Sequence, residues 1–497
     1  MSNLEKWENI IKEKRKKTNF RDFIKEIPSW LWMVFYRNEG VISRYPHTDR
    51  SKICDVKVFD DENSKVLASG LEYDDSIDFF DNVKSLFLNI KLPSMLHYWI
   101  VESSEYADSV LSSNRVYLSN IVILNCENIF YSAFVRENCK DVYNSIYVIG
   151  NNSIIYFSKG IQESYKIFYS KYIIASNNIW FSSNLIWCQE CIFCDNLENK
   201  SYFINNQEFT KEEYLVQKSK ILVQKNIFMD FFFKVNNRGK NYGSTNVAWV
   251  FLTNCEDVEN SACSMNIKNG RHVFFAWSPK WNSNLYDAFP SGAGGWDDFY
   301  AMQWAGWGSS NVYCSMGLSG STSIYYSYFL ENCSFCLACV WLKNKSFCIL
   351  NKQYSKEEWH SLTDKIFSQM NDDGILWDFF PWSLNPFYFN DTAAYLIDDS
   401  FTKEEVEKDG YLWRDEAIKV DIPENAEVLN SKDLNKFQGF DENWNWLIDP
   451  EIMKKVIKDE KWNIYRIVKM EYDFLMKHWL PLPEIHWLER IKMWFKF

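Results

Sequence analysis

Hydrophobic and polar positions between about residues 101 and 205 recur every 13 residues, a period that neither a single strand nor a single helix produces. A polar column contains Ser112, Asn125, Asn138, Asn151, Ser164 and Asn177. An apolar column four positions later contains Val116, Ile129, Val142, Ile155, Phe168 and Phe181, and an aromatic column beside it contains Tyr117, Phe130, Tyr143, Tyr156 and Tyr169. The remaining columns are Ser119, Ser132, Ser145 and Ser158, and then Val122, Val135, Val148, Ile161, Ile174 and Trp187.

This period predicts a stack of short rungs. A rung of that length holds two brief strands and two turns, and it buries its apolar face only by stacking on similar neighbours. A long helix is disfavoured because Ser, Asn and β-branched residues are too dense. We therefore predict a mainly β protein, a parallel β-solenoid with about 13-residue rungs, in which the column from Val116 to Phe168 is buried and stacked.

The array is duplicated. Cys188–Glu213 aligns without a gap with Cys333–Glu358, and both segments end in a helix-capping box, at Thr210–Glu213 and Ser355–Glu358. A second array is therefore expected at about 243–350, where Tyr300, Tyr313 and Tyr326 keep the spacing. The capped helices are expected to close the open ends of the stacks, and a third box lies at Thr402–Glu405.

Four consecutive regions follow from these patterns. Residues 1–100 form an N-terminal α+β region, 101–242 the first array with its capping helix, 243–370 the second array with its capping helix, and 371–497 an α-rich, Trp-rich C-terminal region with a helical tail. The tail, Ile485–Phe497, is basic, aromatic and amphipathic. We expect it to pack against the acidic region around 371–450 or against a second copy of the chain.

Composition narrows the classes of partner. The 497 residues are 47% hydrophobic and 18% aromatic, and the net charge of −12 repels phosphate backbones, so no nucleic-acid partner is expected. No apolar run approaches the length of a membrane span, and the charged N-terminus lacks a signal-peptide core. A membrane partner is thus not expected, and we predict a cytoplasmic protein with reduced cysteines.

Two cysteine triplets have spacing that is typical of metal or iron–sulfur ligands: Cys188, Cys191 and Cys194, and Cys333, Cys336 and Cys339. Neither triplet has an obvious fourth ligand nearby. The alternative is that these cysteines are small residues inside the rungs, as Cys126 and Cys139 are expected to be. We favour this alternative and predict neither a bound metal nor a cofactor.

The stretch from Trp277 to Gly308 is the best candidate for a ligand-binding loop. Its candidate residues are Trp296, Asp297, Asp298, Trp304 and Trp307. Tryptophan can stack on a sugar ring, and paired carboxylates can perform glycoside acid–base chemistry. The alternative is a larger rung with tryptophan in its core. No Gly-x-Ser-x-Gly or His-Glu-x-x-His motif is present, so no catalytic residue is assigned.

Taken together, the rungs and the Asn-Lys segments at Asn199–Glu213 and Asn344–Glu358 resemble an uncharacterised Asn-Cys/Tyr-Ser repeat family of small-genome uncultivated bacteria. Further similar pieces are Ser104–Tyr106, Asn385–Phe387, Gly410–Asp415 and Leu480–Pro483. The resemblance implies a β-solenoid, and in the family zinc-ribbon-like cysteine pairs often lie at the chain ends. This chain has Glu484–Trp487 after Leu480–Pro483, without a cysteine. The resemblance implies no reaction.

The function expected from these features is a non-catalytic structural or protein-interaction scaffold, with a protein partner or self-association. The other hypothesis is a carbohydrate-binding or carbohydrate-cleaving β-helix protein that uses residues 277–308. Carboxyl groups of Asp297 and Asp298 about 5–10 Å apart in an open groove would favour the second hypothesis.

Overall fold

The computed structural model describes residues 3–15, 17–26, 35–38, 41–46, 52–236, 239, 270–273, 286–288, 299–302, 305–306, 308–381, 384–385, 387–415, 422 and 426–495. Its contacts group the chain into two compact units. Unit 1 combines Met1–Leu96 with Lys240–Trp413, and unit 2 combines His97–Gly239 with Arg414–Phe497. Each array therefore packs with a terminal region that is distant in sequence, whereas the sequence patterns suggested four consecutive regions.

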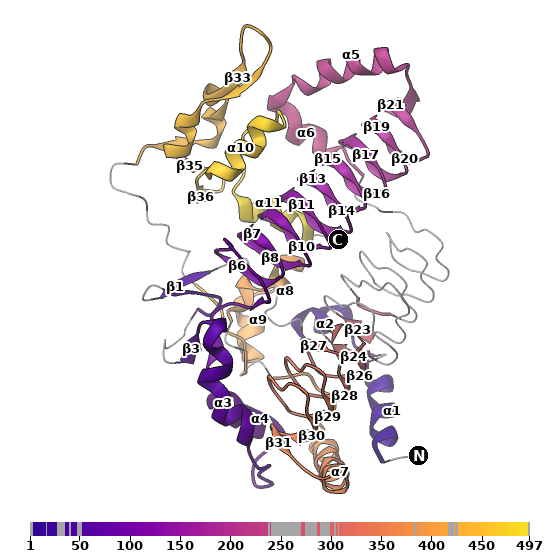
Figure 1. Ribbon diagram of the computed structural model, residues 1–497, viewed down its shortest axis with the longest axis vertical. Coiled ribbons are helices and arrows are strands. Elements are labelled where there is room, and N and C mark those ends of the chain that lie inside the picture. Colours follow the sequence, from indigo (N-terminus) through magenta and orange to yellow (C-terminus); the bar gives the residue numbers. More distant parts are fainter. Residues whose placement is uncertain are drawn as a thin grey trace. The chain divides into compact units, whose positions relative to one another are not determined.

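The first array, in unit 2, consists of two parallel sheets, seen as the purple to magenta stack in Figure 1. One sheet contains β5 (His97–Tyr98), β6 (Ala107–Leu111), β8 (Ser119–Ile123), β10 (Ala133–Arg136), β12 (Ile146–Ile149), β14 (Lys159–Gln162), β16 (Lys171–Ile174), β18 (Ser183–Ile186) and β20 (Asp195–Glu198). The other contains β7 (Asn114–Tyr117), β9 (Glu127–Phe130), β11 (Lys140–Tyr143), β13 (Ser153–Tyr156), β15 (Tyr165–Phe168), β17 (Asn177–Trp180), β19 (Gln189–Ile192), β21 (Ser201–Ile204) and the antiparallel end strand β22 (Gln207–Glu208). The predicted parallel β-solenoid is confirmed.

The backbone of this array repeats in triplets inside each rung. In the central rungs every third side chain points into the rung and is at most 3% exposed, as in the succession Ile155, Ser158, Ile161 and Ser164. Between these inward residues the backbone takes positive φ once in each triplet, for example at Phe157 (49°). Four such triplets complete a turn, so inward positions and bends alternate regularly around the rung.

Rung length is not constant along the array. Val116, Ile129, Val142 and Ile155 form the predicted stacked column at the predicted period, but the next partner of Ile155 is Ile167 and not Phe168. From this point each rung is one residue shorter. The predicted column members Phe168, Phe181, Ile174 and Trp187 are replaced by Ile167, Ile179, Ile173 and Leu185.

The change of step occurs at one corner. Glu137-Asn138-Cys139 and Gly150-Asn151-Asn152 join their strands with three residues, whereas Glu163-Ser164 joins the equivalent strands with two. The additional residues of the longer corners form an amide ladder, in which Asn125 Nδ2 lies 3.3 Å from Asn138 Oδ1 and Asn138 Nδ2 lies 3.1 Å from Asn151 Oδ1. The polar column predicted from the sequence is thus real over these rungs and ends where the corner shortens.

Buried serines connect one rung with the next. The backbone N–H of Ser145 donates to Ser132 Oγ at 3.1 Å, and the N–H of Ser158 donates to Ser145 Oγ at 3.1 Å. Each hydroxyl also donates to a carbonyl two residues earlier, as Ser145 does to Tyr143 at 2.8 Å. The column continues through Ser170 and Ser182 to Cys194. These hydroxyls satisfy N–H groups that water cannot reach, which explains why serine occupies a dry interior.

The second array, in unit 1, has the same construction. Its strands are β23 (Tyr286–Ala288), β24 (Phe299–Met302), β25 (Ala305–Gly306), β26 (Ser310–Tyr313), β27 (Leu318–Ser319), β28 (Thr322–Tyr325), β29 (Ser334–Leu337), β30 (Ser346–Ile349) and β31 (Lys352–Gln353). Tyr300 pairs with Tyr313 as expected, but Tyr313 pairs with Tyr325 and not with Tyr326, because the rung again shortens by one residue. Ser315, Ser327 and Cys339 repeat the buried hydrogen-bonding column.

Two helices cover the ends of the arrays. Both α5 (Lys211–Leu222) and α7 (Lys356–Asp372) begin with a complete capping box, as predicted. Helix α5 packs against β21 and α7 packs against β30, so each helix lies on the last parallel strand of its array. In α7 the Trp359 indole donates to the carbonyl of Cys348 at 3.1 Å and is fully buried.

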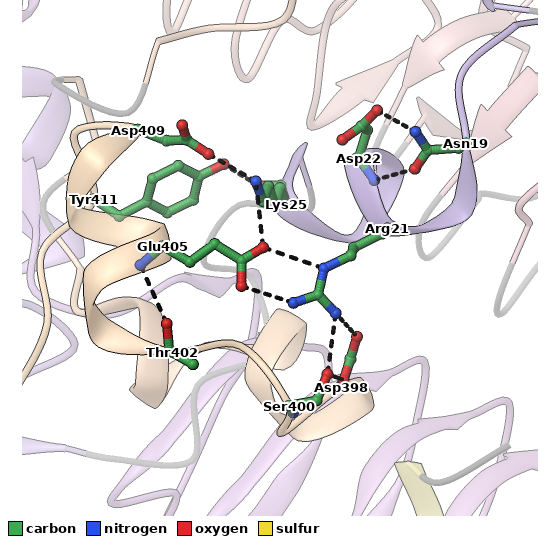
Figure 2. Close-up of polar contacts among 10 residues, drawn as sticks. All are labelled: Asn19, Arg21, Asp22, Lys25, Asp398, Ser400, Thr402, Glu405, Asp409 and Tyr411. Atoms are coloured by element: carbon green, nitrogen blue, oxygen red, sulfur yellow. Dashed lines mark hydrogen bonds and ion pairs between the residues drawn. The ribbon is translucent and has the colours of Figure 1, made fainter.

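The third predicted box, at α9 (Lys403–Lys408), is only half formed. The Thr402 hydroxyl accepts from the Glu405 N–H, but the Glu405 carboxylate binds the Arg21 guanidinium of α2 (Phe20–Glu26) at 2.8 and 3.2 Å (Figure 2). Arg21 also reaches Asp398 at 2.9 Å. This bidentate pair lowers the pKa of Glu405, first through the hydrogen bonds from Arg21. The N-terminal segment is thereby joined to the α9 segment.

The rest of unit 1 surrounds the second array. Its elements are α1 (Asn3–Arg15), β1 (Tyr36–Asn38), β2 (Val41–Ser43), β3 (Ile53–Cys54), α3 (Phe59–Ser69), α4 (Phe79–Leu88), β4 (Leu92–Pro93) and α8 (Ala393–Ile397). Helix α1 packs on α7, with the Trp7 indole donating to Asp364 at 2.8 Å. Gly70, with φ at 60°, approaches the backbone of Lys352 so closely that a Cβ would collide with its nitrogen.

The rest of unit 2 follows the first array or comes from the C-terminal region. Its elements are α6 (Phe228–Phe233), β32 (Val428–Asn430), β33 (Gln438–Phe440), β34 (Trp446–Ile448), β35 (Val456–Lys458), β36 (Ile464–Tyr465), α10 (Lys469–Lys477) and α11 (Trp487–Phe495).

Helix α11 lies within the basic, aromatic tail, and its contacts differ from the expected ones. It packs on the first array rather than on residues 371–450: the Trp494 indole donates to the carbonyl of Asn144 at 2.8 Å, and Lys159 donates to the carbonyl of Trp494 at 2.9 Å. Arg490 is buried against Glu471 of α10 at 3.1 Å. The apolar face of the tail is therefore already covered within unit 2.

Replacing Ser145 by alanine is expected to destabilise the protein by about 1–3 kcal/mol, because the buried N–H of Ser158 loses its acceptor. Urea unfolding followed by circular dichroism measures the change. Ser145→Cys should cost less, since cysteine already continues this column at Cys194. Ser201→Ala, at an exposed position of the same array, is the control and should stay within about 0.5 kcal/mol of the wild type. Equal stability of Ser145→Ala and the control would contradict the role of the serine column.

Deleting Asn138 is expected to leave the array folded, because Glu137 and Cys139 would then form the two-residue corner that Glu163 and Ser164 already form. The expected loss is about 1 kcal/mol, from the amide ladder. Deleting Val142 instead shifts inward residues outward and should unfold unit 2. Far-ultraviolet circular dichroism and limited proteolysis distinguish the two variants, and equal damage by both deletions would contradict the triplet register.

Candidate functional site

The ligand-binding residues predicted from the sequence, Trp296, Asp297, Asp298, Trp304 and Trp307, lie outside the described residues. Strands β24 and β25, between and beside them, do pair within the second array. The carboxylate separation that would distinguish the two functional hypotheses is therefore not defined. The candidate sites below come from other parts of the chain.

The two cysteine triplets occupy successive inward positions of their arrays. The spacing of Cys188, Cys191 and Cys194 is the triplet period of the rung, and all three side chains are at most 2% exposed. Their thiols donate to carbonyls of the same rung, as Cys188 does to Ile186 at 3.3 Å and Cys194 to Ile192 at 3.3 Å. The second triplet repeats these bonds from Cys333 to Glu331 and from Cys339 to Leu337.

The position of these thiols explains a spacing that resembles a metal motif. Among the residues that the structure describes, no group of three or more His, Cys, Asp or Glu side chains has an arrangement that could hold a metal ion. The Cys348 thiol, one rung beyond Cys336, extends the same inward column. The triplets are thus interior residues of the last rungs.

Unit 1 contains a cavity of about 300 Å³, which we call the aromatic pocket. Helix α4, the outer surface of the second array and the aromatic side chains of Phe379, Phe380 and Phe387 contribute to its walls. Stacked rings form two of these walls: Phe329 lies on Trp341 with centroids 4.1 Å apart, and Tyr45 lies on Phe387 at 5.2 Å. Cavities with apolar walls and a few polar groups are the usual form of small-molecule sites.

The polar groups of the aromatic pocket are mostly cationic. Arg44, Lys52 and Lys84 line it, together with Glu26 and Asn385. The Glu26 carboxylate is bound by Arg15, which is itself buried, with one contact of 3.1 Å. Among the described residues that line the pocket, cationic side chains therefore outnumber carboxylates, which favours a positive field there.

Unit 2 displays two similar hairpins. The strands β33 and β34 are joined by Asp441-Glu-Asn-Trp444-Asn445, and β35 and β36 are joined by Asp459-Glu-Lys-Trp462-Asn463. In both turns the aspartate carboxylate accepts two backbone N–H groups; for Asp441 these come from Asn443 at 2.9 Å and Asn445 at 2.7 Å. The same local bonding therefore places one tryptophan at the same position of each turn.

These two tryptophans are exposed in an unfavourable backbone conformation. Trp444 and Trp462 have φ of 62° and 68°, a region that glycine and asparagine adopt most readily, and they are 68% and 75% exposed. Each left-handed residue costs roughly 1 kcal/mol in backbone energy. A large apolar ring is thus displayed at the same left-handed turn position twice in one region, at a cost in stability.

Trp444 belongs to a larger surface that we call the hairpin patch, formed by Phe440, Trp444 and Trp479. The ring of Phe440 lies 6.0 Å from that of Trp444 and 6.2 Å from that of Trp479. Trp479 follows α10, has φ of 58° and is 46% exposed. Contiguous exposed apolar surface of this kind is typical of interaction sites.

The patch rests on a rigid support. The Trp446 indole donates to the carbonyl of Leu480 at 3.0 Å, and Lys225 donates to the carbonyl of Trp479. Lys225 is 7% exposed, and this burial lowers its pKa to about 7. The hairpin patch is therefore held against the helices that follow the first array.

Sequence reasoning missed both sites for different reasons. The hairpin signal was available, since Asp-Glu-x-Trp-Asn occurs at Asp441 and again at Asp459. The aromatic pocket could not be read from the chain, because its walls come from segments that are far apart in the sequence.

Comparison of the chain with protein-family models, with curated proteins and with solved structures found no match. In the described part of the chain, no helix has the length and apolar character needed to cross a membrane. The resemblance to the repeat family consequently stays an expectation, and the functional argument depends on the two sites themselves.

The purified protein is expected to contain less than one equivalent of zinc or iron per chain, because the triplet thiols donate to backbone carbonyls inside closed rungs. Elemental analysis of protein purified without chelators measures this, with metal content after unfolding in chelator as the baseline. Two tightly held metal ions per chain would contradict the interior assignment of the cysteines.

Proposed function

We propose that the protein is a non-catalytic interaction scaffold, whose hairpin patch binds a partner protein. The observation that carries this proposal is the repeated display of tryptophan at left-handed turn positions, at Trp444 and Trp462. Tryptophan is enriched among the residues that dominate binding energy in protein interfaces. The free-energy cost of exposing the tryptophan ring in the free protein is offset when a partner covers the ring.

A protein partner fits the hairpin patch better than a sugar does. Sugar sites combine a stacking ring with polar groups that are free to bind hydroxyls, but both oxygens of the Asp441 carboxylate already accept hydrogen bonds within the turn. The neighbours of Trp444 are the apolar side chains of Phe440 and Trp479. This composition resembles the core of a protein interface more than a sugar-binding surface.

The arrays support the non-catalytic part of the proposal. Inward hydroxyl and thiol groups of the described rungs form hydrogen bonds inside the arrays. The Ser145 hydroxyl bonds to Tyr143 and Ser158, and the Cys194 thiol donates to the carbonyl of Ile192. The cysteines of the described residues are free thiols, which fits the reducing cytoplasm that we propose as the location.

The test uses the full-length protein as bait in extracts of its own cells. We expect at least one protein to be retained stoichiometrically by the wild type and lost with Trp444→Ser/Trp479→Ser. The matched control is Trp187→Ser, which removes an exposed tryptophan at a left-handed position of the first array. Reconstitution with the purified partner should then show at least tenfold weaker binding by the double variant, measured by titration calorimetry.

Two outcomes would contradict the proposal. Retention of every partner by the double variant would show that the hairpin patch is not part of the interface. Binding of the wild type to a glycan array, lost in the double variant without any protein partner, would support the carbohydrate hypothesis instead. Sedimentation at several concentrations identifies self-association if the partner is a second copy.

A further inference from the structure

We infer that the aromatic pocket of unit 1 binds a small, flat, apolar anion, such as an aromatic carboxylate. This inference concerns a different unit from the hairpin patch and does not depend on the proposed interaction function. It rests on the shape of the cavity, the chemistry of its walls and the sign of its charge.

The walls select a flat apolar molecule. Besides the stacked pairs Phe329–Trp341 and Tyr45–Phe387, Tyr328 packs against Phe380 with centroids 4.4 Å apart. Ring faces and edges bind other rings with a preference that aliphatic walls lack. A volume of about 300 Å³ is at the small end of ligand sites, so the occupant has one or two rings.

The charge selects an anion. Arg44 is 6% exposed, and its guanidinium carbon lies 5.2 Å from the ring of Tyr45 and 5.5 Å from that of Phe387. A guanidinium is planar, and its N–H groups match the geometry of a carboxylate. Lys52, which donates to the carbonyl of Leu88 at 2.9 Å, adds a second cation.

One neutral group adds a hydrogen-bond donor. Asn385 lines the pocket, and its Oδ1 accepts from the N–H of Phe387 at 3.0 Å. Its Nδ2 is buried and has no hydrogen-bond partner among the described residues. A buried amide donor of this kind is unfavourable unless an acceptor reaches it. A carboxylate in the pocket would supply that acceptor.

The experiment compares three probes that share one ring system. 2-Naphthoate is an anion, 2-naphthamide is neutral, and 2-naphthylmethylamine is a cation at neutral pH. Titration calorimetry with the full-length protein is expected to show one binding site for naphthoate, at least tenfold weaker binding of the amide, and no binding of the amine. This ranking tests, without any substitution, whether the pocket favours a negatively charged ligand.

Variants then show where in the protein the probe binds. Arg44→Met is expected to weaken naphthoate at least tenfold and to leave the amide unchanged. Lys84→Met, on α4, gives a smaller loss and keeps the test open if Arg44→Met does not fold. Leu384→Trp fills the cavity and should abolish binding of all three probes. Arg466→Met, an exposed arginine of unit 2, is the control and should bind naphthoate as the wild type does.

Three results would overturn the inference. Naphthoate that fails to bind at millimolar concentration shows that the pocket takes no such ligand. The same affinity in Leu384→Trp as in the wild type shows that the probe binds elsewhere. Stronger binding of the amine than of naphthoate shows that the charge argument is wrong. The partner assays of the hairpin patch are unaffected by any of these results.

Discussion

The buried hydrogen bond between an inward serine and the N–H of the next rung is the interaction on which the two arrays depend. A solenoid rung bends four times, and each bend turns backbone groups toward an interior that contains no water. Ser132, Ser145 and Ser158 satisfy those groups with a side chain small enough to stack above itself. Isoleucine, valine and leucine fill the alternate inward positions, and their burial stabilises the stack. Where cysteine replaces serine near the end of each array, it keeps the small size and continues the column.

Much of this architecture could be predicted from the sequence, and the errors in the stacked columns have one origin. The column from Val116 to Ile155 is confirmed, but the prediction failed at Phe168 because a fixed period was extended past the corner at Glu163 and Ser164. The constant quantity is the number of inward residues in each rung, whereas the number of corner residues varies. The capping boxes at Thr210 and Ser355 were predicted correctly, because their bonds join residues that are close in the sequence. At Thr402 only half of the predicted bonds form, because the Glu405 carboxylate binds Arg21, which comes from a distant part of the chain.

The candidate sites show the same limit. The turn at Asp441 is determined by a few consecutive residues, so a repeated motif could have revealed it. The position of the tail could not be predicted, because charge suggested the acidic C-terminal region, whereas the hydrogen bonds of Trp494 with Asn144 and Lys159 place α11 on the first array. The aromatic pocket required the meeting of Tyr45, Trp341 and Phe387, which no single segment encodes. Both candidate sites thus depend on segments outside the rungs, whose positions the repeat does not predict.

The corner that accepts either two or three residues has a consequence for the inheritance of such a gene. A duplication that spans the codons of one whole rung, begun at any point of that rung, adds one complete turn and leaves every inward side chain in its column. Loss of a single codon at the corner likewise leaves every inward side chain in its column. Array length can therefore drift between descendants faster than the identity of the buried residues, and two related chains can differ in the number of rungs while their capping helices and terminal regions stay the same.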